Sequence, residues 1–341
     1  MKMKQTTLAA ALTAMLALGV SGQAAADVYA GSSLLFQNMH LTTFDGGIAP
    51  ANVSPQPFTS YQFTVTNTAT LNGVSAAPNT KTCSGTPSSS SCGALVTLET
   101  ATAANAPGGD PAAFRANNAT NFFGPALQYS NSDSTIFDSQ ITGDAATRTG
   151  QVAESSIISG ANAGANAEIQ STTGFVFQFV LNQAGSLVFE FESDPALRAA
   201  ISGAITAGSS QANINTTISL TQESTGDEIT WSPQGTLGNN CDAGIAGAVC
   251  VEARLDAANA DGVDLNRNLS TSTIPNDLNH DLIAMFYTFG IQMTGLAAGN
   301  YTLALNAVSS TQVSQQIPEP ATLALLGLGL LGMGVTMRRK A

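Results

Sequence analysis

The chain has few of the residues on which most binding and catalytic sites depend. Its 341 residues include one tryptophan, two histidines, four cysteines and eleven lysines and arginines. A zinc site would need cysteines and histidines at short spacings, and the only histidines are His40 and His280. Nucleic acid is not expected as a partner, because basic side chains must neutralise its phosphates. One tryptophan and five tyrosines leave little material for aromatic platforms that bind sugars.

Catalytic motifs are also scarce. There is no Gly-x-Ser-x-Gly elbow, so little supports a serine hydrolase triad through His280. Glu190 and Glu192 share a strand face at about the separation of paired glycosidase carboxylates, but two exposed strand positions explain them more simply. We therefore predict that the protein is not an enzyme. The alternative is a secreted carbohydrate-binding module or carbohydrate-active enzyme.

One polar loop has ligand types that suit calcium. Asn259, Asp261 and Gly262 match positions 3, 5 and 6 of an EF-hand-like loop, and Asp264 follows closely. Position 12 is Asn268, where the standard motif has a bidentate glutamate. Asn259, Asp261 and Asp264 are thus candidate calcium ligands, with an ordinary polar turn as the alternative. No other cofactor is expected.

The four cysteines fall into two local pairs. Cys83 and Cys92, like Cys241 and Cys250, have eight residues between them. Four cysteines allow three connectivities, and we predict local closure because both loops are rich in turn-forming residues. Each loop closure should stabilise the fold by roughly 2–3 kcal/mol. Such disulfides require an oxidising compartment.

The N-terminus has the order of a secretory signal peptide. Lys2 and Lys4 precede an apolar stretch at 8–20, and small residues follow at 24–26. We predict that signal peptidase recognises Ala24 and Ala26 and cleaves after Ala26. Residues 1–26 are then a signal peptide, and the remaining chain is exported.

The C-terminus has a second membrane-directed segment. Pro318, Glu319 and Pro320 are followed by 17 uncharged residues at 321–337 and then by a basic cluster, Arg338, Arg339 and Lys340. A helix over 321–337 would span roughly 25 Å, near the lower limit for a bilayer core of about 30 Å. The basic cluster should stay cytoplasmic, which places the upstream chain outside. A plain C-terminal anchor is the alternative.

This tail resembles the PEP-CTERM sorting signal of exported proteins in Gram-negative bacteria that make exopolysaccharide. The resemblance implies that residues 317–341 are a sorting tail and that an exosortase, a membrane-embedded cysteine protease-transpeptidase, is a partner. It also implies an inner-membrane intermediate, followed by delivery to the outer surface or the extracellular matrix.

Removing both signals makes the chain more acidic. Residues 27–317 keep 22 of the 23 acidic residues and 6 of the 11 basic ones, for a formal charge of −16 against −12 for the precursor. This charge disfavours anionic lipid as a ligand of the exported part. It suits solubility in a crowded matrix or the recruitment of cations and basic partners.

The apolar residues of the exported part recur with a period of two, which indicates β-strands. Residues 175–181 and 187–192, joined by a turn at 182–185, predict one antiparallel hairpin, and 286–293 with 301–308 predict another. Further strands are expected at 61–66, 94–98, 214–220 and 229–231.

Together these strands predict an all-β protein with a single antiparallel β-sandwich of jelly-roll type at 27–316. We expect one short helix at 195–205. Residues 100–173 are poor in large apolar side chains, so long polar loops and edge strands are expected there.

A second resemblance, to a Glu-Asp-Ser-Ala subgroup of PEP-CTERM proteins, lies in the middle of the chain. It rests on residues 154–157, on the Phe-x-Phe-x-Phe strand at 175–179, and on the Asp-Pro-Ala-Leu-Arg-Ala segment at 194–199. Ser155 and Ile157 depart from the subgroup pattern, and the resemblance implies no activity. The sequence predicts an exported structural or adhesive surface or matrix protein linked to exopolysaccharide or biofilm.

Overall fold

The computed structural model shows an all-β protein. It describes residues 27–44, 53–55, 58–86, 89–90, 96–104, 122, 124, 128–138, 147–158, 166–203, 207–234, 241–252, 263–280 and 285–316. Within these ranges no helix is long and apolar enough to cross a membrane. The predicted signal peptide and sorting tail lie outside the described residues.

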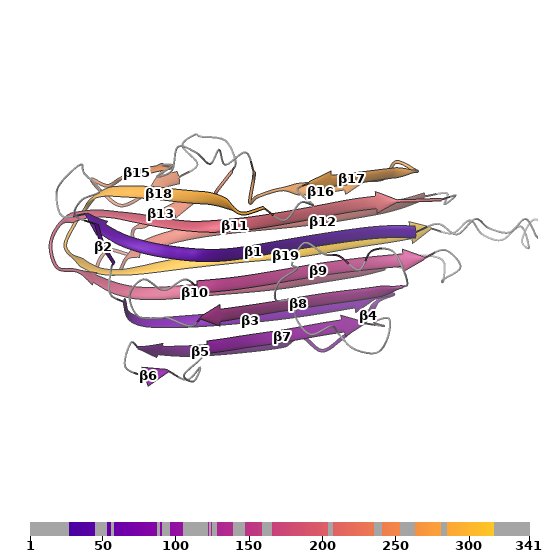
Figure 1. Cartoon of the computed structure of the whole chain (residues 1–341), viewed down its shortest axis with the longest axis horizontal. Coiled ribbons are helices and arrows are strands. Elements are labelled where there is room, and N and C mark those ends of the chain that lie inside the picture. Colours follow the sequence, from indigo (N-terminus) through magenta and orange to yellow (C-terminus); the bar gives the residue numbers. More distant parts are fainter. Residues whose placement is uncertain are drawn as a thin grey trace, which may run out of the picture.

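Two antiparallel sheets pack face to face, which confirms the predicted sandwich (Figure 1). The main path of sheet A runs β15 (Val249–Glu252), β18 (Tyr287–Leu296), β11 (Gly185–Ile201), β1 (Asp27–Phe44), β9 (Thr147–Ile158), β8 (Tyr129–Asp138) and β7 (Val96–Ala104). Two short strands flank this path: β17 (Asn276–His280) pairs with β11, and β2 (Val53–Pro55) pairs with β1.

Sheet B has a similar long central part. Its main path runs β14 (Cys241–Ala243), β13 (Glu228–Trp231), β12 (Ala207–Gln222), β19 (Gly299–Gln316), β10 (Asn166–Leu181), β3 (Phe58–Leu71), β5 (Asn79–Thr86) and β6 (Ser89–Ser90). Here β16 (Asn268–Thr271) pairs with β12, and β4 (Val74–Ser75) pairs with β3.

Strand alternation explains how the two sheets bury their inner faces. On β3, buried Tyr61, Phe63 and Val65 alternate with more accessible polar residues, and β12 and β19 repeat this pattern. Because successive strand side chains point to opposite faces, one side of each strand enters the core. Burying each large apolar side chain contributes roughly 1.5–3 kcal/mol. One large hydrophobic cluster contains residues from both sheets and forms most of the core.

Different strands begin and finish at the two ends of the sandwich, so each end can be named by its strand termini. Asp27, Ile201, Ala207 and Gln316 lie together, because β1 pairs with β11 at Val28 and Ile201 and β12 pairs with β19 at Ala207 and Gln316. We call this the tail end; Figure 1 shows it on the right, where β1 begins and β19 finishes. The opposite end, where β11 begins and β12 finishes, is called the disulfide end.

The predicted hairpins have the right strands but the wrong pairing. β10 and β11 lie in different sheets, and so do β18 and β19. The turn at 182–184 therefore crosses between sheets, and Phe177 and Phe179 face the core from sheet B while Phe189 and Phe191 face it from sheet A. Alternation specifies which face is buried, but a hairpin and a crossing between sheets both satisfy it.

The predicted helix at 195–205 is wrong where the structure describes it. Residues 195–201 continue β11 and pair with β1 along their whole length. Leu197 and Ile201 fill the core, and Pro195 lies between the parts of β11 that pair with β18 and with β17. Pairing on both sides of this strand outweighs the helix preference of Ala, Leu and Arg.

The expectation of loops and edge strands at 100–173 is also wrong in part. β9 lies between β1 and β8, so it is an internal strand of sheet A. Its residues 151–157 are all buried. An internal strand whose two faces are both covered can consist of small and polar residues. Such a strand cannot be recognised in the sequence by its large apolar residues.

Candidate functional site

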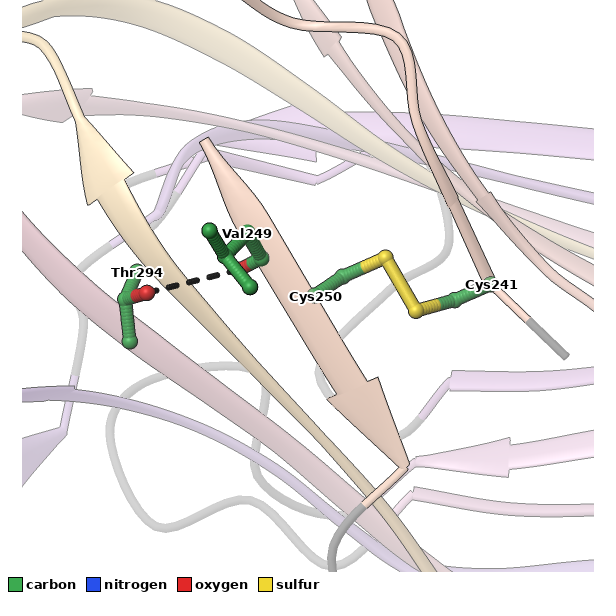
Figure 2. The surroundings of a disulfide bond; sticks show 4 residues. All are labelled: Cys241, Val249, Cys250 and Thr294. Carbon is green, nitrogen blue, oxygen red and sulfur yellow. Dashed lines mark hydrogen bonds between the residues drawn. A yellow bond between two sulfur atoms is a disulfide. The ribbon is translucent and has the colours of Figure 1, made fainter. Parts of the chain in front are cut away.

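One of the predicted disulfides joins the two sheets. Cys241 lies on β14 of sheet B and Cys250 on β15 of sheet A, and their Cα atoms are 6.2 Å apart (Figure 2). On the other side of β15, Thr294 Oγ1 on β18 donates a hydrogen bond to Val249 O. Cys83 on β5 is disulfide-bonded as well, whereas Cys92 lies outside the described residues.

The candidate calcium loop is described only at its end. Asn259 and Asp261 lie outside the described residues, and Asp264 is half-buried. Asp264 Oδ1 accepts a hydrogen bond from the backbone N–H of Asn266 at 2.7 Å, and Asn266 in turn contacts Thr216 and Pro233. No group of three or more acidic, histidine or cysteine residues suited to a metal occurs in the described ranges. Calcium binding stays a prediction.

The paired glutamates have different surroundings. Glu192 Oε2 accepts hydrogen bonds from the side-chain amides of Gln37 and Asn38, both at 2.8 Å. These donors come from an irregularity in β1, where Asn38 has a φ of 53°. Glu190 lies opposite His40, and partial burial raises the pKa of its carboxyl. The arrangement gives Glu192 a structural role in holding this bulge.

The lone tryptophan is in the core. Trp231 is fully buried, with its ring centroid 5.8 Å from that of Phe191. It therefore offers no surface for stacking a sugar. The large exposed hydrophobic side chains of the described residues are Val74, Val180, Val249, Val251 and Met285, and none of them is aromatic.

The outer face of sheet B is a broad surface of hydroxyl and amide groups. We call it the polar face, and it covers the outward positions of β12, β19, β10, β3 and β5. Its hydroxyl and amide side chains are Ser60, Gln62, Thr64, Thr66, Thr68, Thr70, Thr80, Thr82, Ser84, Thr86, Gln178, Ser209, Gln211, Asn213, Asn215, Thr217, Ser219, Thr221, Asn300, Thr302, Asn306, Ser310, Gln312 and Ser314.

Charge is sparse on this surface. None of the side chains named above is acidic or basic, and Glu168 is the one acidic residue at an outward register position of the five strands. Two further acids border it: Glu223 accepts a hydrogen bond from Thr302 Oγ1, and Glu228 on β13 pairs with Thr221. Cross-strand hydroxyl pairs order it: Thr64 and Thr82 Oγ1 atoms are 3.2 Å apart, and those of Thr66 and Thr80 are 3.0 Å apart. Groups of this kind repeat about every 6.8 Å along a strand and about every 4.8 Å across strands.

A groove of about 340 Å³ lies on the polar face near the disulfide end. Its lining residues come from β3, β5 and β10: Ser60, Tyr61, Gln62, Ser84, Gly85, Thr86, Val176 and Gln178. Ser60 Oγ donates to Gln178 Oε1 at 2.6 Å, which fixes the orientation of that amide. Hydroxyls and amides both donate and accept hydrogen bonds, so this lining suits a neutral polyhydroxylated ligand.

The outer face of sheet A is different, because it carries a charged network that joins buried Tyr29 and Glu154 to the more exposed Arg198 and Asp277. Tyr29 Oη donates to Glu154 Oε1 at 2.8 Å, and Tyr129 Oη lies 3.4 Å from the same oxygen. The Arg198 guanidinium lies 5.6 Å from the centroid of the Tyr29 ring and makes a bidentate ion pair with Asp277. Burial, together with the Glu154 carboxylate, raises the pKa of Tyr29 well above its ordinary value.

Gly31 provides the space that this network needs. A Cβ atom there would lie 2.7 Å from Tyr29 Oη and 3.0 Å from the Phe122 ring, so no larger residue fits without movement. Glu154 and Arg198 both belong to the second resemblance, for which the sequence offered only a structural explanation, with Arg198 in the predicted helix at 195–205. Tyr29 and Gly31, which connect them, had no signal in the sequence. Membership of the subgroup stays a prediction.

Comparisons with known proteins bear on the C-terminus alone. Residues 316–340 match the family model of the PEP-CTERM protein-sorting motif, which contains the predicted signal residues Pro318, Glu319, Pro320, Arg338, Arg339 and Lys340. No curated protein and no solved structure matches the chain. The motif indicates an exported surface protein that an exosortase processes.

Proposed function

From this sorting motif and the polar face, we propose that the protein is a non-enzymatic structural or adhesive component of the cell surface or extracellular matrix that contacts exopolysaccharide. The polar face of sheet B carries this proposal. It is a broad surface of hydroxyl and amide groups with few charges, whereas residues 27–317 as a whole carry a formal charge of −16.

The chemistry of the polar face fits a long neutral or weakly charged glycan. Each hydroxyl or amide contributes only a small net free energy, about 0.5–1.5 kcal/mol for a typical hydrogen bond. A polymer that crosses five strands makes many such contacts at once, and their sum gives avidity without a deep pocket. The small number of carboxylates also makes repulsion of an acidic polysaccharide weaker here than on the more acidic parts of the surface.

The proposed route follows from the two ends of the chain. Signal peptidase removes residues 1–26, the segment at 321–337 holds the chain in the inner membrane of a Gram-negative cell, and the exosortase then removes the tail. The folded part reaches the outer surface or the matrix. The Cys241–Cys250 disulfide supports an oxidising destination, because such bonds persist outside the cytosol.

A binding experiment with matched variants tests the proposal. The processed protein is incubated with exopolysaccharide purified from the producing cells, and the bound fraction is measured by co-sedimentation. Gln62→Glu with Gln178→Glu places two carboxylates beside the groove and should reduce binding. Gln292→Glu, on the outer face of sheet A, adds the same kind of charge elsewhere and should leave binding unchanged. Equal binding by all three proteins would exclude the polar face as the contact surface.

Enzyme activity and calcium binding need separate measurements. The proposal predicts no release of reducing ends from the same polysaccharide. Calorimetric titration of the processed protein with calcium tests the loop that contains Asn259, Asp261 and Asp264. Neither heat nor a thermal shift at millimolar calcium would end that hypothesis.

A further inference from the structure

The strand that leads into the sorting motif is an internal strand of sheet B. β19 lies between β12 and β10, and its last residue, Gln316, pairs with Ala207. On the other side, Ser314 pairs with Asn166. Only Ile317 separates Gln316 from Pro318, so almost no linker lies between the folded sandwich and the motif.

This short connection conflicts with what a protease needs. A protease binds its substrate as an extended segment whose backbone groups pair with the enzyme. Gln315 and Gln316 already pair with β12, and Ser314 pairs with strands on both sides, so these residues are not a free extended segment in the folded chain. The last rungs of β19 must therefore open before an enzyme can hold the chain on the amino side of the motif.

We propose that opening of the C-terminal rungs of β19, with the tail end of the sandwich facing the membrane, controls removal of the sorting tail. The inference rests on the exosortase processing and the membrane-held intermediate of the proposed function. Tail removal breaks one peptide bond: the carbonyl carbon stays with the sandwich and is taken by water or an acceptor amine, and the amino group leaves with the tail.

The surface at the tail end suits this orientation. Of the described residues that begin or finish strands there, Asp27 alone is charged; Glu168 lies two residues into β10, and Asp277 is paired with Arg198. The disulfide end carries Glu223, Asp227 and Glu228 in and beside one turn. A membrane surface with anionic lipid repels carboxylates, so the less acidic end faces it at lower cost.

A spacer placed after β19 tests the need for opening. The full chain, with six Gly and Ser residues inserted between Gln316 and Ile317, is produced in cells that contain the exosortase. Pulse-chase labelling then gives the half-life of the tail-bearing form. We expect that half-life to fall about tenfold, since roughly two backbone hydrogen bonds no longer have to break. The same insertion between Thr225 and Gly226, at the disulfide end, should leave it unchanged.

A covalent lock tests the same step in the opposite direction. Ser209 on β12 and Ser314 on β19 are directly paired, with their Oγ atoms 2.7 Å apart on the polar face. Ser209→Cys with Ser314→Cys should close a disulfide and prolong the tail-bearing form by about tenfold or more, because the rung can no longer separate. The single variant Ser314→Cys should behave like the parent, and adding the spacer to the locked chain should restore fast removal.

The outcomes separate this inference from the proposed function. A spacer variant that is processed at the parental rate overturns the inference, whether or not the lock forms. A locked chain, verified by mass spectrometry, that loses its tail at the parental rate also overturns it. Neither readout involves polysaccharide, so a failed binding experiment would leave the inference intact. Tail removal that does not depend on the exosortase would remove the basis of both.

Discussion

The two halves of the core hold the sheets together by different means. Towards the disulfide end the core is aromatic, with Phe191 stacked on Phe289 at 5.4 Å and packed against Trp231. Towards the tail end the core has no such aromatic stack: aliphatic side chains such as Leu197 and Ile201 lie beside small and polar ones, and hydrogen bonds cross between the sheets. Asn67 Nδ2 on β3 donates to Ser134 Oγ on β8 at 2.7 Å, and Asn67 Oδ1 accepts from Ser132 Oγ at 2.9 Å.

This difference shows how one sandwich can divide stability and specificity between its ends. Large apolar side chains supply most of the free energy of folding, but they tolerate exchanges of similar volume. A buried hydrogen bond contributes little net free energy, yet leaving one partner unpaired is costly, so the tail end has few acceptable alternative pairings. The end nearest the sorting motif is therefore held by register-specific contacts.

The largest effect is expected in the aromatic half. Trp231→Ala should lower the free energy of unfolding by about 3–5 kcal/mol, because it leaves a cavity between the sheets. Urea denaturation of the processed protein measures this change. Trp231→Phe should cost much less, since the indole N–H has no hydrogen-bond partner among the described residues. Similar losses for both variants would mean that ring volume is not what stabilises this half.

Breaking the disulfide should have the next largest effect. Replacing Cys241 and Cys250 together with alanine should cost about 2–3 kcal/mol, because the connection between β14 and β15 then closes without a covalent constraint. Thermal unfolding of the double variant gives the loss. No change in the midpoint would show that the aromatic packing alone holds the edges of the two sheets.

In the polar half, Asn67→Ala should cost about 1–3 kcal/mol, because the Ser132 and Ser134 hydroxyls lose their shared partner in a buried position. Thr66→Ala, on the opposite face of the same strand, should stay within about 0.5 kcal/mol. Chemical denaturation distinguishes the two variants. Equal effects would contradict the assignment of a structural network to this half.

The smallest effect is a dependence on pH outside the core. Burial raises the pKa of Glu190 above its ordinary value of 4.5, so its carboxyl holds a proton more tightly in the folded chain. The tighter proton binding by folded Glu190 therefore stabilises the fold fully below pH 4.5, and this stabilisation is lost as the pH rises through the raised pKa. Relative to the parent, Glu190→Gln should therefore gain stability between acid and neutral pH, as thermal unfolding across that range would show. If the stabilities of Glu190→Gln and the parent changed with pH in the same way, the predicted effect of Glu190 would be contradicted.

Much of the strand content follows from the sequence, because alternation of apolar and polar residues is a local property. Strands were expected within β3, β10, β11, β12 and β19, and for β11 the buried face of Leu187, Phe189 and Phe191 was expected as well. The pairing was not, since the crossing turns after β10 and β18 satisfy the same alternation as hairpins. The segment after Asp194 shows the same limit, because its helix preference is local and the two neighbouring strands that override it are remote.

The candidate surfaces could be predicted even less. The polar face is assembled from β12, β19, β10, β3 and β5, whose order in the sheet is not their order in the chain. In any one strand, its serines and threonines resemble ordinary solvent-facing residues. The charged network on sheet A also depends on the order of the strands. Glu154 and Arg198 are 44 residues apart in the chain and meet only through Tyr29, which lies on the strand between theirs.

The sequence by itself determined where the chain is sent, because a sorting motif is a continuous segment whose chemistry is legible residue by residue. It also determined which side of the first part of β11 is buried, where Leu187, Phe189 and Phe191 alternate with the other residues. The tertiary structure alone decided which faces are polar or charged, that β1 begins and β19 finishes at the same end of the sandwich, and that β19 pairs with β12 as far as Gln316, next to the motif. These properties depend on which strands become neighbours, and pairing between distant segments leaves no local pattern.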